Sequence, residues 1–386
     1  MSMSKPVAML VSRNLPPLQG GMERLNQHVF LELRQACDVS IIGPRGAKRY
    51  LRDARRVQTC PVTPVSLFLA CASVKAVRSA RRHHPVLILA GSGANSVPAW
   101  LAAKLSNVPW GVYLHGLDVL TENYWYQRVM LPIIRKADFF LANSRATAEV
   151  AQKAGISGEL IHILHPGVTF PEEIPSSEAV LEWRQSINVG DRPLILSVGR
   201  LMRRKGLREF ISNAFPAILT QYPRAMLVIV GSEPSGALKK DAVGTAELRD
   251  AAAASGVSRN VVFLGKIDDE ALRMAYCASS IHVFPVLELS GDMEGFGMVA
   301  IEAAAHGLPT IAFQTGGVSD SVRDGVSGSL IPPGEYDQFA RHCCQWLAQS
   351  GDVLARKQCR QFSKQFEWRE FGKSLRAIPP IRKALT

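Results

Sequence analysis

Short apolar runs rich in Val, Ile and Leu alternate along the chain with amphipathic stretches of roughly 10 to 18 residues. This alternation is typical of a parallel sheet whose strands are joined by crossover helices. In the first half it predicts strands at Val7–Val11, Val39–Ile42, Val86–Leu89, Gly111–Leu114, Phe139–Ala142 and Ile161–Leu164. In the second half it predicts strands at Leu194–Val198, Leu227–Val230, Val261–Leu264, Ile281–Phe284 and Thr310–Ala312. We therefore predict an α/β protein with two doubly wound parallel sheets.

A turn-rich region separates the two sets of strands. Phe170–Ser177 combines acidic residues with two prolines, and Asn188–Pro193 is again typical of a turn. A chain of 386 residues corresponds to two or three domains at about 150 residues each. We predict an N-terminal domain over residues 1–180 and a C-terminal domain over 190–365. Residues 366–386, apolar and basic at helical spacing, are expected to form a C-terminal helix that packs back on the N-terminal domain.

The composition is that of a globular protein with a basic surface. Hydrophobic residues make up 47% and charged residues 20% of the chain, which argues against intrinsic disorder. The formal net charge of +12 implies an anionic partner, such as a phosphate-bearing ligand, an anionic membrane or nucleic acid. The seven cysteines lack metal-ligand spacing and indicate no disulfide framework. Because no apolar run is long enough for a signal peptide or a spanning helix, we expect a cytoplasmic, soluble or peripheral protein.

Two loops that follow predicted strands have residues suited to binding phosphate. Gly20 and Gly21 stand where the first strand turns into a helix, so the backbone can approach an anion at the helix N-terminus. A plain glycine turn is the alternative interpretation. The loop Gly199–Gly206 places Arg200 and Lys205 between a strand and a helix. A guanidinium and an ammonium there can neutralise a diphosphate, whereas the alternative is a solvated basic loop.

The stretch Gly291–Gly307 combines a glycine-rich turn with two carboxylates. Glu294 lies in the turn, and Glu302 lies within an otherwise apolar helix of Met, Val, Ala and Ile. Since an unpaired carboxylate is costly to bury, Glu302 is expected to meet hydroxyl groups or cations. The alternative is a surface glutamate on a small helix.

Together these motifs resemble a known family. Glu294 and Glu302, preceded by the basic loop and by Gly20-Gly21, resemble the retaining nucleotide-sugar glycosyltransferases of the GT-B fold, specifically the large bacterial family four. Further matches cover nearly the whole chain, at His115–Asp118, Asn143–Arg145, Pro166–Val168, Val230-Gly231, Gly265 and Gly307–Gly317. The resemblance implies two Rossmann-like domains that face a central crevice. It places the acceptor on the N-terminal domain and the nucleotide-sugar donor on the C-terminal domain.

The resemblance also implies a role for each motif residue. Arg200 and Lys205 hold the donor diphosphate and stabilise the leaving nucleotide, and Glu302 accepts hydrogen bonds from the ribose hydroxyls. Glu294 contacts the donor sugar, and His115 lies over the sugar ring near the reacting carbon. The remaining donor-binding groups are expected to be contributed by Gly20, Gly21, Gly231, Gly295, Phe296 and Gly297.

The expected reaction moves a hexose from a nucleotide diphosphate sugar to a lipid-linked or polysaccharide acceptor, as in polysaccharide or lipopolysaccharide biosynthesis. The glycine-rich motif is similar to the subgroup that uses GDP-mannose, with a UDP-sugar as the alternative. The loops Gly231–Pro234 and Gly265–Asp269 are expected to flank the base. No Asp-x-Asp motif occurs, so neither a metal nor another cofactor is expected. Arg203 and Arg204 depart from the family pattern, and either extend the anionic site or add surface charge.

Three other readings remain open at this stage. A GT-B nucleotide-sugar epimerase or phosphorylase shares the same motifs. A dinucleotide-binding oxidoreductase is disfavoured because Gly91-Ser92-Gly93 is followed by Ser96 where that fingerprint has glycine. A nucleic-acid-binding protein explains the net charge, yet the basic residues do not interleave with aromatic residues, so no nucleic-acid partner is expected.

A basic segment beside an apolar run suggests where the protein works. Between Arg45 and Arg82 the only acid is Asp53, and the apolar run is Leu67–Ala70. The cations within this segment are Lys48, Arg49, Arg52, Arg55, Arg56, Lys75, Arg78 and Arg81. Each cation near an anionic membrane contributes about 1 kcal/mol. We expect a peripheral contact with the inner face of the plasma membrane. The alternative is a solvated surface with Leu67–Ala70 in the core.

Overall fold

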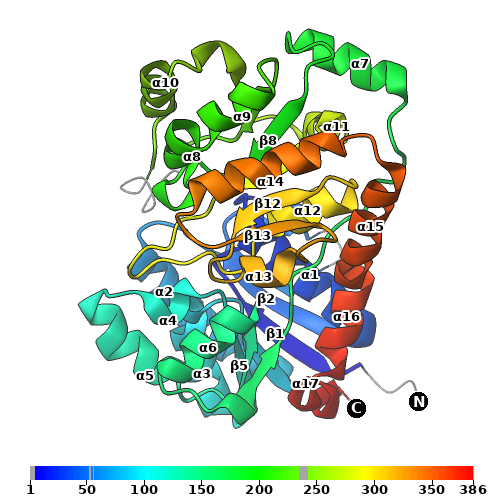
Figure 1. The fold of residues 1–386 in the computed structure, drawn as a ribbon. Coiled ribbons are helices and arrows are strands. Elements are labelled where there is room, and N and C mark those ends of the chain that lie inside the picture. Colours follow the sequence, from blue (N-terminus) through cyan, green and yellow to red (C-terminus); the bar gives the residue numbers. More distant parts are fainter. Residues whose placement is uncertain (1–4, 52–53, 55, 234–241, 386) are drawn as a thin grey trace. The chain divides into compact units, whose positions relative to one another are not determined.

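The computed structural model describes residues 5–51, 54, 56–233 and 242–385. The chain divides into two compact units, each with its own parallel sheet (Figure 1). Unit 1 consists of Met1–Gly167 together with Trp368–Thr386, and unit 2 consists of Val168–Glu367.

Unit 1 is built on a parallel sheet of seven strands within the described residues, in the order β3-β2-β1-β4-β5-β6-β7. The strands are β1 (Val7–Val11), β2 (Asp38–Pro44), β3 (Arg56–Cys60), β4 (Leu87–Ala90), β5 (Trp110–Leu114), β6 (Phe139–Ala142) and β7 (Ile161–Ile163). The connecting helices are α1 (Gly21–Ala36), α2 (Val65–His83), α3 (Ser96–Ser106), α4 (Leu117–Leu120), α5 (Leu131–Ile134) and α6 (Arg145–Lys153). The strand order reverses between β1 and β4, which makes the carboxyl ends of these two strands a favoured ligand position.

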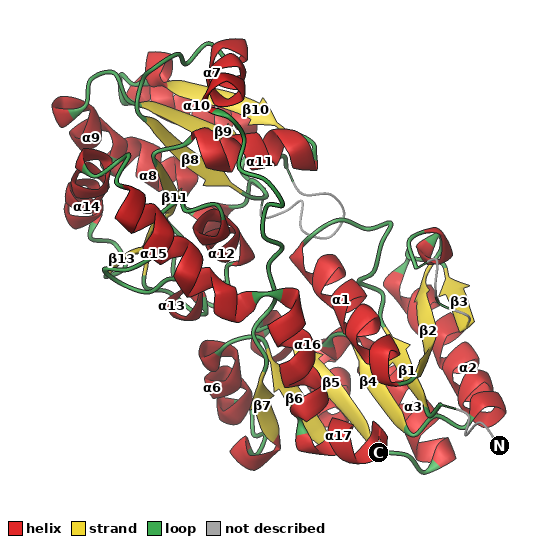
Figure 2. Cartoon of the chain, turned by 90° about the vertical axis from the view of Figure 1, so that its right-hand side faces the viewer, coloured by secondary structure: helices red, strands yellow, loops and turns green. Residues whose placement is uncertain are grey.

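Helices cover both faces of this sheet (Figure 2). On one face α2 and α3 pack side by side, and Phe68, Ala72 and Ala99 share a core with Met9 and Ile88 of the sheet. The strands of this sheet are almost continuously apolar because both of their faces are buried.

Unit 2 repeats the plan with a six-stranded parallel sheet among the described residues, in the order β10-β9-β8-β11-β12-β13. The strands are β8 (Leu194–Val198), β9 (Met226–Val230), β10 (Val261–Gly265), β11 (Ile281–Phe284), β12 (Thr310–Phe313) and β13 (Gly328–Ile331). The helices are α7 (Ser177–Ser186), α8 (Leu207–Asn213), α9 (Phe215–Gln221), α10 (Thr245–Ala254), α11 (Asp269–Ala278), α12 (Met298–Ala305), α13 (Val318–Ser321), α14 (Tyr336–Ala348) and α15 (Val353–Ser363). Here the order reverses between β8 and β11.

The predicted fold class, two doubly wound parallel sheets, is confirmed, and the predicted strands agree closely with the observed ones. The sequence analysis missed two strands, β3 and β13, and both lie at the edge of their sheet. An edge strand packs against one neighbour only, so it does not need a continuous apolar run. The side chains of β3 are mostly half-buried, and β13 begins with Gly328 and Ser329.

The C-terminal residues belong to unit 1 and form α16 (Trp368–Ala377) and α17 (Pro379–Leu385). The helix α16 packs against α1, where the ring of Trp368 stacks on His28 with the ring centroids 3.6 Å apart. Arg376 donates to Glu32 at 2.8 Å. The carboxylate of Glu32 is thereby paired at a buried position.

The chain passes between the units at two neighbouring points. Val168, the first residue of unit 2, donates its amide hydrogen to Phe366 at 2.7 Å, and it forms a parallel bridge with Glu367. On the other side of the same crossing, a Cβ on Gly167 would overlap the ring of Trp368. The two connecting segments are therefore held together by a backbone hydrogen bond and by close packing.

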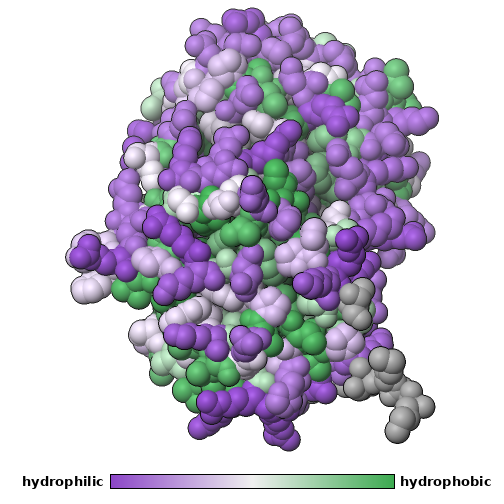
Figure 3. Space-filling model, turned by 90° about the horizontal axis from the view of Figure 1, so that it is seen from below, coloured by the Kyte–Doolittle hydropathy of each residue, from purple (hydrophilic) through white to green (hydrophobic). Residues whose placement is uncertain are grey.

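Hydrophobic and hydrophilic residues are interspersed on the face that Figure 3 shows. Within the described residues, no helix has both the length and the apolar character needed to cross a bilayer. All seven cysteines carry free thiols.

Candidate active site

The basic loop of unit 2 leaves the carboxyl end of β8 and forms a 3-10 turn over Arg203–Lys205. Gly206 ends the turn with a φ of 66°, and a Cβ at this position would overlap the carbonyl oxygen of Pro285. Only glycine fits this approach without strain. The turn directs Arg204 inward, with 8% of the residue exposed, while Arg200 remains exposed.

Four charged side chains meet at this loop, and we call them the paired cluster: Arg204, Lys205, Asp292 and Glu294. Arg204 donates to both carboxylate oxygens of Asp292, at 2.9 and 3.1 Å, and its Nε lies 3.3 Å from Glu294. Lys205 Nζ donates to Glu294 Oε2 at 2.7 Å. Two cations and two carboxylates are therefore joined in one buried network. Buried charges are tolerated when they are paired in this way.

The charges in the paired cluster control one another's protonation. Burial alone would raise the pKa of Glu294, but Lys205 and Arg204 outweigh burial and lower it, so this carboxyl is ionised at neutral pH. Burial lowers the pKa of Lys205, as do the charges of Arg204 and Arg200, whereas Glu294 raises it. The ammonium of Lys205 also lies 4.6 Å from the ring centroid of Phe284. With Arg200 included, three cations face two carboxylates, so the loop has room for a further negative charge.

The glycine-rich loop that carries Glu294 is held in place by Gly317. Gly317 donates its amide hydrogen to the carbonyl of Glu294 at 2.8 Å, and a Cβ on Gly317 would overlap the carbonyl of Gly295. Gly297 has a φ of 88° and immediately precedes α12, while the side chain of Phe296 is buried. The loop is thus held in one shape directly before a helix N-terminus, which favours negative charge.

Glu302 lies on α12 and meets a hydroxyl group. Tyr276 donates its phenolic hydrogen to Glu302 Oε2 at 3.1 Å. His306 ends the same helix region: its ring stacks on Tyr276 with the centroids 5.0 Å apart, and its Nδ1 lies 2.8 Å from the carbonyl of Glu302. Glu302 therefore belongs to a contact group with Tyr276 and His306, and the structure gives it no direct contact with Glu294.

Gly231 lies where three strands of unit 2 end together. It donates its amide hydrogen to Gly265 at 2.8 Å, and a Cβ at this position would overlap the carbonyl of Gly199. The basic loop and the two loops expected to flank the base thus start from adjacent points. Pro234, which the sequence analysis placed in one of these loops, lies outside the described residues.

In unit 1, His115 follows β5 and is held by hydrogen bonds. Its Nε2 lies 3.0 Å from the carbonyl of Gly91, and its amide donates to Asp118 at 2.7 Å. The second oxygen of Asp118 accepts from the amide of Gly93 at 3.0 Å. Burial raises the pKa of Asp118, and the contacts with His115 and Gly93 oppose that rise. The loops after β4 and β5 therefore form one polar group at the strand-order reversal of this sheet.

Gly20 and Gly21 form the start of α1 as the sequence predicts, with Gly20 before the helix and Gly21 as its first residue. A carboxylate already occupies this helix N-terminus. Glu23 accepts from Asn14 Nδ2 at 2.9 Å and lies against Gly20. The negative charge of Glu23 beside Gly20 therefore opposes an anion at this helix start.

Some of the predicted site residues lie together in the structure, and others lie in separate groups. Lys205 and Glu294 are in direct contact, and Arg200 is close enough to lower the pKa of Lys205. The group around Glu302 lies further along α12, and His115 belongs to unit 1. Among the described residues, no group of three or more His, Cys, Asp or Glu side chains is arranged to hold a metal ion.

The sequence analysis missed two members of the paired cluster. Arg203 and Arg204 were expected either to extend the anionic site or to add surface charge. For Arg204 the second expectation is wrong, because this residue is buried and bonded to Asp292 and Glu294, whereas Arg203 is exposed. Asp292 lies inside the glycine-rich motif, two residues before Glu294. The sequence signal for this pairing is weak, because it consists of a cation in one loop and a second acid in the glycine-rich motif.

Solved structures share this architecture along most of the chain. The Anabaena protein Alr3699/HepE, solved in complex with UDP-glucose, superposes with a TM-score of 0.77 at 22% identity, over 95% of this chain and 98% of its own. Sucrose-phosphate synthase from Thermosynechococcus elongatus gives a TM-score of 0.78 at 21% identity, over 99% of this chain and all of its own. The fold is that of the GT-B glycosyltransferases.

Sequence comparison places the chain within that class. The family described as Glycosyltransferase Family 4 matches residues 19–170, and the family described as Glycosyl transferases group 1 matches residues 180–366. The chain belongs to the family-four glycosyltransferases of the GT-B fold.

Curated relatives carry more specific names. A GDP-mannose-dependent alpha-(1-6)-phosphatidylinositol monomannoside mannosyltransferase of Mycolicibacterium smegmatis is 28% identical over 363 residues, which is 90% of this chain and 89% of that protein. A D-inositol 3-phosphate glycosyltransferase of Corynebacterium urealyticum is 27% identical over 303 residues, which is 73% of this chain and 69% of that protein.

Proposed function

We propose that this chain is a retaining hexosyltransferase that uses a nucleotide diphosphate sugar, of the GDP-mannose type, and a lipid-linked or saccharide acceptor. The observation that carries the proposal is the paired cluster beside the exposed Arg200, at the carboxyl end of β8. This is the end of a doubly wound sheet at which ligands bind. The choice of GDP-mannose is supported by the printed donor of the Mycolicibacterium smegmatis relative.

The proposed mechanism rests on neutralising the leaving group. When the sugar–phosphate bond breaks, negative charge develops on the departing diphosphate. Lys205 and Arg200 then stabilise this charge in a site where Lys205 is already held in place by Glu294. We assign no enzymic nucleophile, because acceptor attack on the face that the phosphate leaves retains the anomeric configuration. We assign no metal ion, because Arg200 and Lys205 supply the positive charge that a metal would otherwise provide.

The other residues bind and orient the substrates in this proposal. Glu302 accepts hydrogen bonds from the ribose, with Tyr276 fixing its carboxylate. Glu294 contacts the donor sugar, and the clamped loop Gly295–Gly297 offers backbone amides to sugar and phosphate oxygens. In unit 1, His115 contacts the sugar ring through an imidazole fixed by Gly91. Gly20, Gly21 and Gly231 allow close approach of the backbone to the phosphates and the base.

The test is nucleotide binding measured by thermal shift with GDP, UDP, ADP and dTDP. A ligand at 100 times its Kd stabilises the folded protein by about 2.7 kcal/mol, so the cognate nucleotide is easily recognised. We expect the largest shift with GDP, a lost shift in Lys205→Ala, and a normal shift in Arg203→Ala, whose side chain is exposed. A larger shift with UDP than with GDP would indicate a UDP-sugar as the donor in place of GDP-mannose. No shift with any of the four would reject the proposed function, and acceptor-independent release of the sugar would favour an epimerase or phosphorylase instead.

We further propose that unit 1 contacts an anionic membrane, on the cytoplasmic leaflet, through the outer face of α2. Leu67 and Val74 on this helix are 49% and 50% exposed, and Arg78 and Arg81 continue the same stripe at helical spacing. The apolar run of the sequence analysis is split, because Phe68 is fully buried in the core. An exposed apolar stripe that ends in cations suits the interfacial region of a bilayer.

The structure also narrows the set of cations available for this contact. Arg56 pairs with Asp38 at 3.2 Å, and Lys75 donates to the carbonyl of Thr59 at 2.6 Å. Arg52 and Arg55 lie outside the described residues. The exposed cations are Arg45, Lys48, Arg49, Arg78, Arg81 and Arg82.

Co-sedimentation with anionic and neutral liposomes tests the membrane contact. We expect binding to anionic vesicles that weakens at high salt and is lost in Arg78→Glu/Arg81→Glu. The matched control is Arg341→Glu/Lys357→Glu, which makes the same charge change at exposed positions of unit 2. Equal binding to neutral vesicles, or equal loss in both double variants, would remove α2 from the contact.

A further inference from the structure

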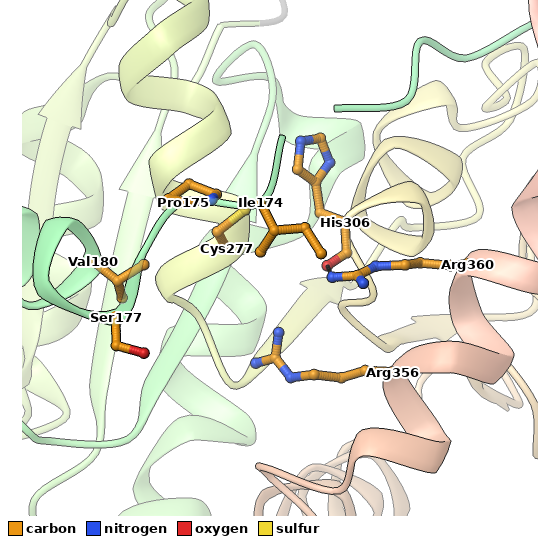
Figure 4. Close-up of a pocket in the computed structure, with 8 residues that line it drawn as sticks. All are labelled: Ile174, Pro175, Ser177, Val180, Cys277, His306, Arg356 and Arg360. Atoms are coloured by element: carbon orange, nitrogen blue, oxygen red, sulfur yellow. Dashed lines mark hydrogen bonds between the residues drawn. The ribbon is translucent and has the colours of Figure 1, made fainter. Parts of the chain in front are cut away.

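A second basic site lies in unit 2, away from the basic loop (Figure 4). We call it the arginine pocket. It is a cavity of about 260 Å³ lined by Ile174, Pro175, Ser177, Val180, Cys277, His306, Arg356 and Arg360. Both arginine side chains extend from α15 into the cavity, and His306 reaches it from the end of α12.

The two guanidiniums are close to each other and have few partners. Arg356 and Arg360 are one helical turn apart, so they lie on the same face of α15. Arg356 donates to the carbonyl of Ser279 at 3.1 Å, and Arg360 reaches the carbonyl of His306 at 3.4 Å. The Nε of Arg360 is buried without a hydrogen-bond partner. Each guanidinium has five N–H donors, so most of these donors are available to a ligand.

No carboxylate compensates this pair. The lining contains no acidic residue, and in the described part of the chain neither Arg356 nor Arg360 forms an ion pair. Burial lowers the pKa of Arg356, and the charge of Arg360 lowers it further. Burial also lowers the pKa of His306, with Arg360 acting in the same direction and Glu302 opposing it. Two half-buried like charges are unfavourable unless an anion is bound between them.

A helix N-terminus adds to the positive potential. The ten-residue helix α7 begins at Ser177, which lines the cavity, so its first amide groups lie near the guanidiniums. Two of its first amides already have partners, because Ser176 accepts from the amide of Ala179 at 3.2 Å and the exposed carboxylate of Glu178 accepts from its own amide. The start of α7 therefore adds only part of the usual attraction of a helix N-terminus for negative charge, and the two guanidiniums carry the site.

We propose that the arginine pocket binds a phosphate group, either as free phosphate or as a small phosphate ester. Arg356 and Arg360 provide the forked donors that match phosphate oxygens, and Ser177 at the start of α7 lines the same cavity. A cavity of about 260 Å³ is several times larger than the roughly 30 Å³ of one water molecule, so it has space for a sugar attached to the phosphate.

This site is separate from the paired cluster, but it borders the proposed ribose ligand, because His306 lines the pocket and stacks on Tyr276, which donates to Glu302. Glu294 and Gly297 precede α12, whereas His306 follows it. The helix has eight residues, which at about 1.5 Å per residue separate its two ends by roughly 12 Å. No residue of the paired cluster lines the arginine pocket.

Calorimetry with inorganic phosphate at constant ionic strength tests the proposal. We expect the wild-type chain to bind phosphate, and Arg356→Gln/Arg360→Gln to bind it at least about 10-fold more weakly, since two charge-assisted contacts are lost. Arg341→Gln/Lys357→Gln is the matched control, because it removes the same two charges from exposed positions of unit 2. Lys205→Ala, which alters the proposed donor site, should retain phosphate binding.

Other results would overturn the site. If the wild-type chain does not bind phosphate, the proposal is wrong. It is also wrong if Lys205→Ala loses phosphate binding while Arg356→Gln/Arg360→Gln binds phosphate normally. Titration with glucose 6-phosphate distinguishes the two sources of the phosphate group. Tighter binding than inorganic phosphate supports an ester ligand, and equal or weaker binding supports free phosphate.

Hydrogen exchange of the wild-type chain keeps the proposal testable if the double variant does not fold. Added phosphate should slow amide exchange in residues 174–180 and 353–363, which surround the pocket. Slower exchange confined to residues 199–206 would assign the phosphate to the basic loop and reject the arginine pocket.

Discussion

The paired cluster and the arginine pocket are two basic sites in the same unit, and they handle positive charge in opposite ways. In the paired cluster, Arg204 and Lys205 each contact a carboxylate within 3.3 Å. In the arginine pocket, the hydrogen bonds that Arg356 and Arg360 donate within the described part of the chain go to backbone carbonyls. The first site is held together by its own charges, whereas the second has no opposite charge of its own.

This difference separates two ways to prepare a phosphate site. Carboxylates that pair with the cations fix their positions before a ligand arrives, which suits a site that must stabilise a transition state. Cations without carboxylates retain more of their attraction for an anion, at a cost to the stability of the empty protein. We therefore expect the same substitution to have opposite effects on stability at the two sites.

The largest effect is expected for Arg204→Gln. This change leaves the partly buried carboxylate of Asp292 without its bonded cation and leaves Glu294 paired with Lys205 alone. Breaking a buried ion pair in this way typically costs about 3 to 5 kcal/mol, so the urea midpoint of unfolding should fall sharply. Arg203→Gln is the control, because its side chain is exposed in the same turn. Equal midpoints for the two variants would show that Arg204 does not hold the cluster together.

The next largest effect concerns turnover. Lys205→Ala should reduce kcat by roughly 100-fold or more, the scale of a lost electrostatic stabiliser of the leaving group. Arg200→Lys should cause a similar loss, because a point charge does not replace the bidentate fork. Arg360→Gln, which changes the arginine pocket, is the comparison in the same assay without phosphate. We expect this variant to have normal kcat. Near-normal turnover of a folded Lys205→Ala enzyme would remove this residue from the mechanism.

A pH series separates the carboxylate contribution of the paired cluster. The folded-state pKa of Glu294 lies below its ordinary value of 4.5, because Lys205 and Arg204 outweigh the effect of burial. The ionised group therefore stabilises the fold above about pH 4.5, and this contribution is lost as the pH falls through the folded-state pKa. The difference in unfolding free energy between the wild-type chain and Glu294→Gln should thus be constant above pH 4.5 and shrink below it. A difference that does not change with pH would contradict the assigned ionisation.

The smallest effect is expected in the empty arginine pocket. Arg360→Gln removes one of two like charges, so its stability in phosphate-free buffer should lie within about 1 kcal/mol of the wild type and on the stable side. Thermal unfolding at low salt measures this. A loss comparable to that of Arg204→Gln would show that Arg360 already has an opposite charge, and the contrast between the two sites would fail.

Much of the fold could be predicted because a strand buried on both faces needs a continuous apolar run. The runs at Val7–Val11 and Leu194–Val198 coincide with β1 and β8. The edge strands β3 and β13 were not predicted, for different reasons. The residues of β3 are mostly half-buried and include polar ones, whereas β13 is mostly buried but begins with Gly328 and Ser329 and so lacks a continuous apolar run. The motifs also predicted that Lys205 lies in a loop between a strand and a helix and that Glu294 lies in a turn before a helix. The ion pair between the two residues was not predicted, and their proposed roles toward a donor remain predictions.

The inward position of Arg204 could not be predicted. Three consecutive cations at 203 to 205 give no sign of which one is buried, because the 3-10 turn decides the direction of each side chain. Its partner Asp292 is 88 residues away along the chain. The arginine pocket is harder still, since it is assembled from α7, α11, α12 and α15 and from the segment before α7.

The return of the chain to unit 1 has a consequence for synthesis on the ribosome. Trp368 and Arg376 cover His28 and Glu32 of α1, yet they are made after all of unit 2. At roughly 5 to 20 residues per second, the 200 residues of Val168–Glu367 delay that contact by about 10 to 40 s. During this interval a nascent unit 1 exposes the face of α1 that α16 later covers, where a chaperone can bind. A premature stop directly after Glu367 would leave every residue of unit 2 in place and make the defect in unit 1 permanent.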